Sequence, residues 1–383
     1  QLDASHGARF DPNLMVYHWD SFDPSSPNFG KARPWVAAAN DPSSIFQTAV
    51  SSNQSVLFDG GSEKGFFKLG YTRTDDKGIM PNSKITKNLV NFGGSYNVTS
   101  KLTAGINLNY SNIAGRGRYG TGYEDRNMMT TFRQWWQTNV DVQEQKDAYF
   151  RNRQNITWNW RGYGTGLTPQ YADNPYWALY ENYGTDGRNR FIGNTSLNYK
   201  PTEWLNILGR ISTDFYSELQ EERFAVGSHS AASYKRTNHN FRESNYDLMF
   251  NFDRDLSSDI NVKALLGTNV RDGRDEYIVA QTNGGLVVPR LYSLSNTKNA
   301  VTPPYERDER EQVWGNYAGA TFTWRDMVTL DATIRNDQSS TLPKGENSYW
   351  YPSVSGGFTF SKLLPSATWL SYGKLRANYA QVG

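Results

Sequence analysis

The sequence contains 383 residues, and 40 Lys and Arg stand against 38 Asp and Glu, which gives a formal net charge of +2. This balance argues against a nucleic-acid-binding protein held by bulk electrostatics, and the absence of cysteine excludes disulfides and thiolate metal sites. Mean hydropathy is -0.71, and no stretch approaches the roughly 18 apolar residues that a membrane helix needs. A membrane β-barrel remains compatible with these values, because only every second residue of each strand meets lipid.

The beginning of the chain carries no targeting signal. It starts Gln-Leu-Asp, without an initiator Met, a basic segment or an apolar segment. We therefore expect either a processed protein or an internal piece of a longer one. Residues 1–50 are rich in Pro, Ser, Asp and Asn and show little periodicity, so they are predicted to form a long loop.

From about residue 53 onward, short stretches alternate apolar and polar residues. In residues 328–335, Val, Leu, Ala and Ile alternate with Thr, Asp, Thr and Arg. Because a strand points successive side chains to opposite faces, each stretch has one apolar and one polar face. One predicted strand carries Phe67, Leu69 and Tyr71 on one face. The others lie near 53–60, 86–98, 101–112, 189–200, 204–217, 241–253, 259–272, 311–324, 327–338, 350–360 and 371–382.

The connections between these strands alternate short and long. Tight turns are expected at 62–65, 99–100, 200–203, 255–258 and 325–326, with a slightly longer one at 361–370. The longest connection, 113–188, has room for a short helix around 126–150, and a connection of that length is usually functional or disordered. This pattern predicts an all-β fold, an antiparallel transmembrane β-barrel with short periplasmic turns and long extracellular loops.

The domain organisation follows from the same pattern. Residues 1–50 are expected to be an extracellular loop, and 51–383 a partial barrel of about twelve strands that includes the large extracellular loop 113–188. Polar residues on the strands should face the lumen, since Arg or Lys costs about 2–4 kcal/mol at the lipid midplane. The predicted lumen-facing residues are Asn107, Asn109, Asn245, Asp247, Asn251, Lys263, Asn269, Arg271, Asp331, Arg335, Arg376 and Asn378.

Catalytic and metal-binding patterns are weak in this sequence, so neither an enzyme nor a cofactor or metal site is predicted. The four histidines fall in predicted loops and lack partners at metal-ligand spacing. The glycine-rich run 115–122 leaves an amphipathic strand, which favours a flexible loop root over a phosphate cradle. Acidic clusters at 272–276 and 306–311 could hold Ca²⁺, but the interleaved arginines favour self-paired, solvated loops.

Aromatic residues in the large loop are the candidate substrate contacts. Flat rings stack on sugar faces and pack against peptides. The candidates are Trp135, Trp136, Trp158, Trp160 and Tyr163. The alternative is that these rings build a small core of the loop or contact a partner protein. Tyr176 and Trp177 belong to a motif that favours such an architectural role.

Four segments resemble the SusC/RagA group of TonB-dependent outer-membrane transporters. They are 58–103 (beginning FDGGSEKGFF), 172–182 (ADNPYWALYEN), 335–364 (containing YPSVSGGFTF) and 370–383 (LSYGKLRANYAQVG). The resemblance implies a barrel of about 22 strands, of which this chain would supply an internal portion. The family's plug domain and TonB-contacting segment are not visible in the sequence.

The resemblance also implies a function. SusC-like proteins of the Gram-negative outer membrane import oligosaccharides or peptides, work with a SusD-like surface lipoprotein and are energised by the TonB complex. The sequence does not separate a glycan substrate from a peptide substrate. Two other readings stay open: a secreted β-rich carbohydrate-binding or adhesin domain, and a passive porin.

Overall fold

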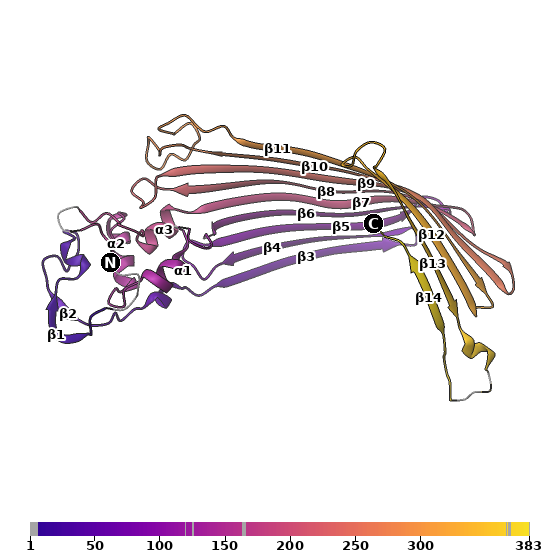
Figure 1. Cartoon of the computed structure of the whole chain (residues 1–383), viewed down its shortest axis with the longest axis horizontal. Helices are drawn as coiled ribbons and strands as arrows, with labels where there is room; N and C mark the ends of the chain where they lie inside the picture. The colour runs from indigo at the N-terminus through magenta and orange to yellow at the C-terminus, as the bar shows by residue number, and fades with distance from the viewer. Residues whose placement is uncertain are drawn as a thin grey trace.

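The computed structural model describes residues 7–118, 120–124, 126–162, 166–364, 366 and 369–382. Its main feature is a twelve-stranded antiparallel sheet, which we call the wall, in which every strand from β3 to β14 pairs with its neighbours in sequence. Figure 1 shows the wall as a long curved sheet with an irregular domain at one end. The predicted all-β antiparallel fold is confirmed.

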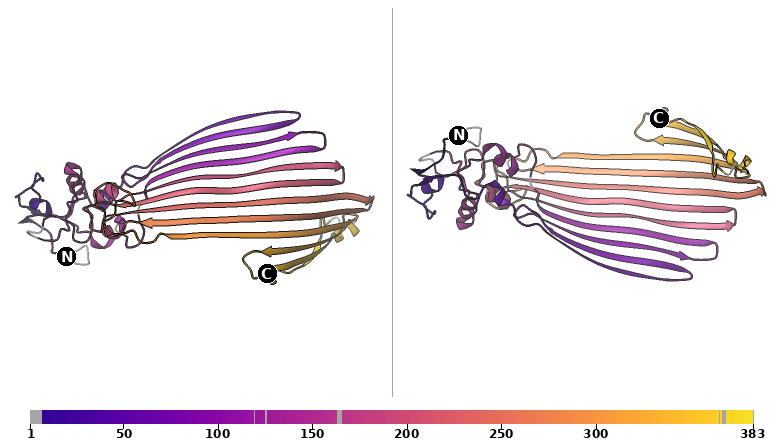
Figure 2. Two further views of the ribbon diagram at one scale, coloured as in Figure 1. Left: turned by 90° about the horizontal axis from the view of Figure 1, so that it is seen from above. Right: turned by 90° about the horizontal axis from the view of Figure 1, so that it is seen from below.

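The wall strands and their bounds are β3 Val50–Ser62, β4 Gly65–Lys77, β5 Lys84–Asn97, β6 Leu102–Arg118, β7 Gly184–Thr202, β8 Leu205–Phe224, β9 Ser233–Ser257, β10 Ile260–Gln281, β11 Tyr305–Trp324, β12 Val328–Ser339, β13 Ser348–Phe358 and β14 Leu375–Ala380. Within the described residues, β3 and β14 are the two edges, so the wall is an open sheet there. The views in Figure 2 show its strands fanning out from the irregular domain.

The two ends of the wall differ in their connections. At one end, the turn end, the strands are joined mostly by two or three residues, as between β11 and β12. Arg325 and Asp326 there have φ values of 52° and 49°, the left-handed geometry of the tight hairpin turns that match the twist of the strands. The opposite end, the loop end, carries the irregular domain and the long connections (Figure 1).

The wall has one apolar and one polar face, because residues opposite each other in an antiparallel pair point to the same side. Large apolar side chains remain exposed on the apolar face, among them Leu266 at 54% and Leu330 at 53%. Trp314 and Trp324 lie ten residues apart on this face of β11 and bracket its apolar stretch. A spanning strand needs about 9–11 tilted residues, so this spacing matches the thickness of a bilayer.

The buried core lies in the irregular domain, which we call the loop domain. It comprises the described residues of 7–49 and of the connection between Arg118 and Gly184. Its elements are β1 Asp11–Val16, η1 Trp19–Phe22, β2 Arg33–Trp35, η2 Pro42–Ile45, α1 Met128–Thr130, η3 Thr131–Trp135, α2 Val142–Asn152 and α3 Pro175–Glu181, while η4 Phe360–Leu363 lies at the turn end. No helix among the described residues is long and apolar enough to cross a membrane.

Two sequence-based expectations require correction here. Residues 1–50 are not a featureless loop, because β1 and β2 form a small sheet and η2 packs against α2. Several strands also extend further toward the loop end than their alternation indicates, so that β9 begins at Ser233 and β10 ends at Gln281. On the loop-end side of the apolar stretch that Trp314 brackets, both faces of the strands are polar. The alternation of apolar and polar residues therefore ends before the strand itself ends.

Candidate functional site

The polar face of the wall is the first candidate surface. Asp247 pairs with Asn269, and Asn245 pairs with Arg271, so all four share one side of β9 and β10. The register continues through β11 and β12 to β14 and places the other predicted inward residues on the same side. The predicted residues on this face are Asn107, Asn109, Asn245, Asp247, Asn251, Lys263, Asn269, Arg271, Asp331, Arg335, Arg376 and Asn378.

Charges on the polar face are joined into short networks. Arg210 Nε lies 2.9 Å from Asp247 Oδ2, and Asn269 donates to the other oxygen of Asp247 at 2.7 Å. Arg271 forms ion pairs with Glu243 and Glu311. These pairs cross from strand to strand, so the face is a hydrated lining whose charges are held in place by their neighbours.

A β-bulge adds one charge to this face. The register shifts between Arg116 and Arg118, and Gly117 has a φ of +74°. A Cβ on Gly117 would lie 2.3 Å from the carbonyl oxygen of Asn82, so only glycine fits the bulge. The extra residue turns Arg118 to the polar side, where its Nε lies 2.5 Å from Asp186 Oδ1. The run at 115–122 is thus partly a strand end and not only a flexible loop root.

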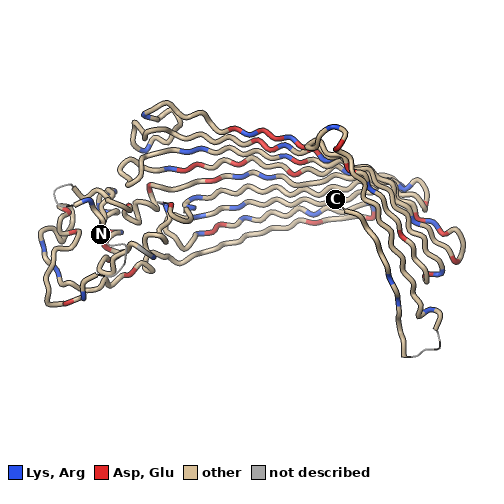
Figure 3. The backbone as a smooth tube through the Cα atoms, viewed as in Figure 1, with Lys and Arg blue, Asp and Glu red and all other residues tan. Residues whose placement is uncertain are grey.

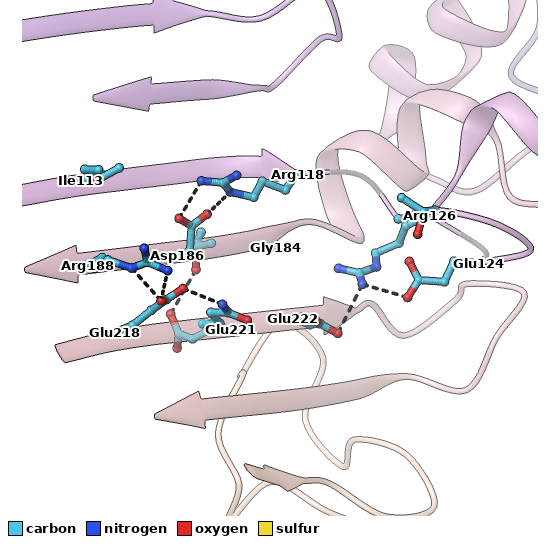
Figure 4. A pocket seen from close by; sticks show the side chains of 14 residues that line it. Ile113, Arg118, Glu124, Arg126, Gly184, Asp186, Arg188, Glu218, Glu221 and Glu222 are labelled. Carbon is cyan, nitrogen blue, oxygen red and sulfur yellow. Dashed lines mark hydrogen bonds and ion pairs between the residues drawn. The ribbon is translucent and has the colours of Figure 1, made fainter. Parts of the chain in front are cut away.

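A charged pocket of about 560 Å³ lies where β6, β7 and β8 meet the loop domain. Figure 4 shows Arg118 pointing toward Asp186 and Arg188 toward Glu218, with a 2.5 Å ion pair in each case. Arg126, from the loop domain, points to Glu222 of β8 at 3.3 Å. The Arg126 side chain is 8% exposed and that of Glu222 34%, so a buried guanidinium meets a partly exposed carboxylate where the loop domain joins the wall.

An aromatic cleft of about 330 Å³ lies within the loop domain beside that pocket. Trp135 of η3 and Trp158 line it, together with the exposed rings of Tyr123 and Tyr171. Its polar lining includes Asn127, Glu124, Asp173 and His229. Glu124 also lines the charged pocket, so the two cavities adjoin. Aromatic faces next to hydrogen-bonding groups suit both sugar rings and peptides.

The other candidate aromatics lie elsewhere. Trp136 is 2% exposed, donates its Nε1–H to Val140 O at 3.1 Å and packs edge-on against Phe132. This burial corrects the assignment of Trp136 as a substrate contact, because its ring is packed in the apolar core of the loop domain. Trp160 packs 5.3 Å from Phe22 in the second cluster of the loop domain. Tyr163 lies outside the described residues.

The 172–182 motif holds the loop domain together. Asn174 is fully buried, its Oδ1 accepts from the amide of Tyr176 at 2.8 Å, and its Nδ2 donates to two backbone carbonyls. Asp173 accepts from Asn155, from Asn182 and from the amide of His229. His229 thereby reaches the aromatic cleft, a placement that its sequence neighbours do not indicate. Among the described residues, no group of three or more His, Asp or Glu side chains is arranged to hold a metal ion.

Burial raises the pKa of two tyrosines in this domain. Desolvation raises the pKa of Tyr149 to about 12, and Tyr149 donates to Glu181 Oε1 at 3.0 Å. Desolvation also raises the pKa of Tyr176 to about 12. Both hydroxyls are protonated at physiological pH, and that of Tyr149 acts as a structural hydrogen-bond donor.

The two acidic clusters occupy strand ends and not loops. Residues 272–276 belong to β10 and 306–311 to β11, and the two segments pair with each other. Arg274 Nη2 lies 2.8 Å from Asp308 and 2.9 Å from Glu276. The expected self-pairing of acids and arginines is therefore present, and it joins neighbouring strands.

Comparisons with known proteins agree with this geometry. No family model matches the chain. The chain is 22% identical over 378 residues to TonB-dependent receptor P26 of Formosa agariphila, an alignment that covers 94% of this chain and 35% of that protein. The chain matches the structure of the RagAB peptide transporter with a TM-score of 0.73 at 15% identity, over 94% of this chain and 40% of that one.

A more distant structure shares the same architecture. The outer membrane transporter YddB from Escherichia coli matches with a TM-score of 0.52 at 9% identity, over 96% of this chain and 41% of that chain. The chain thus spans between a third and a half of the length of these relatives. At these identities the structural matches establish the fold alone, an antiparallel sheet like part of the barrel wall of these proteins.

Proposed function

We propose that this chain belongs with the TonB-dependent receptors of the Gram-negative outer membrane that resemble SusC and RagA, and that it takes part in nutrient import, from its similarity to TonB-dependent receptor P26 and to the RagAB transporter. The imported molecules are oligosaccharides or peptides. A SusD-like surface lipoprotein delivers them, and the TonB complex energises their passage. The protein performs no covalent chemistry on its cargo.

The two-faced wall carries this proposal. Its apolar face exposes a continuous band of large side chains, while its polar face carries cross-strand ion pairs. A secreted adhesin or sugar-binding domain would bury such a band, since soluble monomers rarely expose apolar patches of this extent. The band bracketed by Trp314 and Trp324 fits a lipid-facing surface with aromatic borders.

The two adjoining cavities at the loop end support substrate capture there. The aromatic cleft supplies the Trp135 and Trp158 rings, and the charged pocket supplies carboxylates and guanidiniums of the polar face. One structural relative, RagAB, is named a peptide transporter, which favours peptides as the first substrates to test. A groove of about 490 Å³ lined by Tyr17, Trp35 and Trp160 offers an apolar surface to a lipoprotein partner.

The test uses the full-length protein in cells with and without an intact TonB system. Energised uptake of a labelled peptide or oligosaccharide library should require TonB. Uptake that persists unchanged without TonB would support a passive porin, and recovery of the protein in buffer without detergent would contradict the membrane barrel.

The cleft is tested with the double variant Trp135→Ala/Trp158→Ala. Loss of two ring contacts should weaken substrate binding by about tenfold or more. The matched control is Trp369→Ala, because Trp369 is 82% exposed and lies at the turn end, far from the cleft. Equal binding by both variants, with the loop domain intact in limited proteolysis, would reject the cleft as the capture site.

A further inference from the structure

Three arginines lie opposite one another on the apolar side of the wall. Arg274 of β10 is in register with Arg242 of β9 and with Arg310 of β11. They lie on the same face as Leu266 and Trp314. Arg274 is eight residues from Leu266 on β10, Arg310 is four residues from Trp314 on β11, and Arg242 is opposite Arg274, so all three point to that side. Like charges directly opposite each other destabilise a sheet, so the row calls for a physical explanation.

The row lies just outside the apolar band. Arg310 is four residues beyond Trp314 toward the loop end. At about 3.3 Å per residue and a strand tilt of about 40°, this separation raises it by about 10 Å. With the long loops outside the cell, the row therefore lies at the headgroup level of the outer leaflet. Figure 3 shows the acidic and basic residues alternating along this part of β11.

The outer two arginines of the row share a single carboxylate, whereas the central one has two. The central Arg274 is satisfied by Asp308 and Glu276. Arg242 and Arg310 both reach Asp272, at 3.4 Å and 3.1 Å, so two guanidiniums share one carboxylate. The Asp272 side chain is 12% exposed, whereas those of Arg242 and Arg310 are 54% and 67% exposed. The buried carboxylate thus contacts two largely exposed guanidiniums.

An apolar groove of about 380 Å³ lies on the same face below this pair. Leu248, Leu266 and Ala318 line it, and Thr268 forms part of its rim. Thr268 is six residues below Arg274 on β10, which corresponds to about 15 Å of depth at the same tilt. Asn316, the partner of Thr268 on β11, is two residues inside Trp314, so the groove lies in the outer part of the apolar band. The groove and the arginine pair are therefore spaced like the chains and headgroup of one lipid.

We propose that Arg242 and Arg310 form a binding site for a phosphate-bearing lipid of the outer leaflet. The phosphate accepts hydrogen bonds from both guanidiniums, a geometry that arginine forks favour. Asp272 positions the two side chains beforehand, which reduces the entropy lost on binding. The acyl chains rest along Leu248 and Leu266. This site is independent of the capture cavities, which lie in the loop domain and on the polar face.

The test measures lipid binding to the full-length protein in neutral detergent micelles. The probes are a fluorescent phosphatidic acid and the matching diacylglycerol, which lacks only the phosphate. Phosphatidic acid should bind about tenfold more tightly. Arg242→Gln/Arg310→Gln should remove that difference and leave diacylglycerol binding unchanged. Either single variant should reduce the difference, so the test does not depend on the double variant folding.

Arg307→Gln is the matched control. Arg307 lies on the same strand as Arg310, near the same height, but its register partner is Tyr277 of the polar face. The Arg307→Gln variant should bind both lipids with the same affinities as the unmodified protein. The site is overturned if phosphatidic acid shows no preference, or if Arg307→Gln weakens it equally. Complete displacement of the lipid by millimolar inorganic phosphate would overturn the lipid assignment and indicate a free-phosphate site.

Discussion

Asn174 shows at the residue scale how one side chain organises the loop domain. It caps α3, and its amide also ties α3 to α2 and to Ile156 through their carbonyl oxygens. Because it is fully buried, no water can replace these contacts. Its neighbours Tyr176 and Trp177 are buried in the core of the domain, which supports the architectural reading of the motif over substrate contact.

Asn174→Ala should destabilise the loop domain by about 2–4 kcal/mol. The change removes a helix cap worth about 1 kcal/mol and leaves two buried carbonyls without donors. The midpoint of denaturant unfolding, followed by tryptophan fluorescence, measures the effect. Asn127→Ala is the control, since Asn127 caps α1 but is only partly buried. An unchanged midpoint for Asn174→Ala would show that the motif does not hold the domain together.

At the scale of a single strand, the pattern of side chains distinguishes the part that lies in lipid from the part beyond it. Between Trp314 and Trp324, β11 has one apolar and one polar side, as lipid on one side and water on the other require. Nearer the loop end both sides are polar, and the strands continue on cross-strand ion pairs such as Arg274 with Asp308. Alternation therefore marks the part of a strand that lies in lipid, and the ion pairs mark the part beyond it.

Leu265 and Leu266 are adjacent leucines on opposite faces of the wall, so the same substitution at each position tests which face meets lipid. Leu266 is 54% exposed on the apolar face, and Leu265 is opposite Gly319 on the polar face. Leu266→Arg should destabilise the folded protein by about 2–4 kcal/mol, because the charge meets lipid near the midplane. Leu265→Arg should cost much less, because its side chain reaches the hydrated face.

Reversible unfolding of the full-length protein in lipid vesicles measures this pair. Equal losses for the two variants would contradict the assignment of the faces. A larger loss for Leu265→Arg would reverse it.

At the scale of the whole molecule, the wall and the loop domain are stabilised by different means. The wall satisfies its backbone through continuous ladders and leaves its apolar face to lipid. The loop domain has a conventional buried core that includes Trp136 and Trp177. The two parts are joined by the ion pair of Arg126 with Glu222 and by contacts to the loops between wall strands, such as Asn82 Nδ2 to Leu179 O and Trp177 Nε1 to Ser228 Oγ.

Two unfolding transitions should follow from this difference. The loop domain should lose its tryptophan fluorescence signal at a lower denaturant concentration than the one at which the wall loses its strand signal in circular dichroism. Local units of low stability open before the global structure does. Arg126→Ala should move only the first transition, because it removes the buried guanidinium through which the loop domain contacts Glu222. A single, coincident transition would show that the two parts fold as one unit.

The amino-acid sequence by itself determined the fold class, because the two-residue period of a strand is written directly in the alternation of residues 328–335. It also determined which polar residues share a face, since Asp247 and Arg335 follow that period. Only the tertiary structure decided where β9 and β10 end, because both faces are polar there. Packing alone separated Trp136, in the core, from Trp135, in the cleft, although they are adjacent. The bulge at Gly117 and the arginine row at Arg242, Arg274 and Arg310 likewise depend on register between strands, a long-range property that local patterns do not carry.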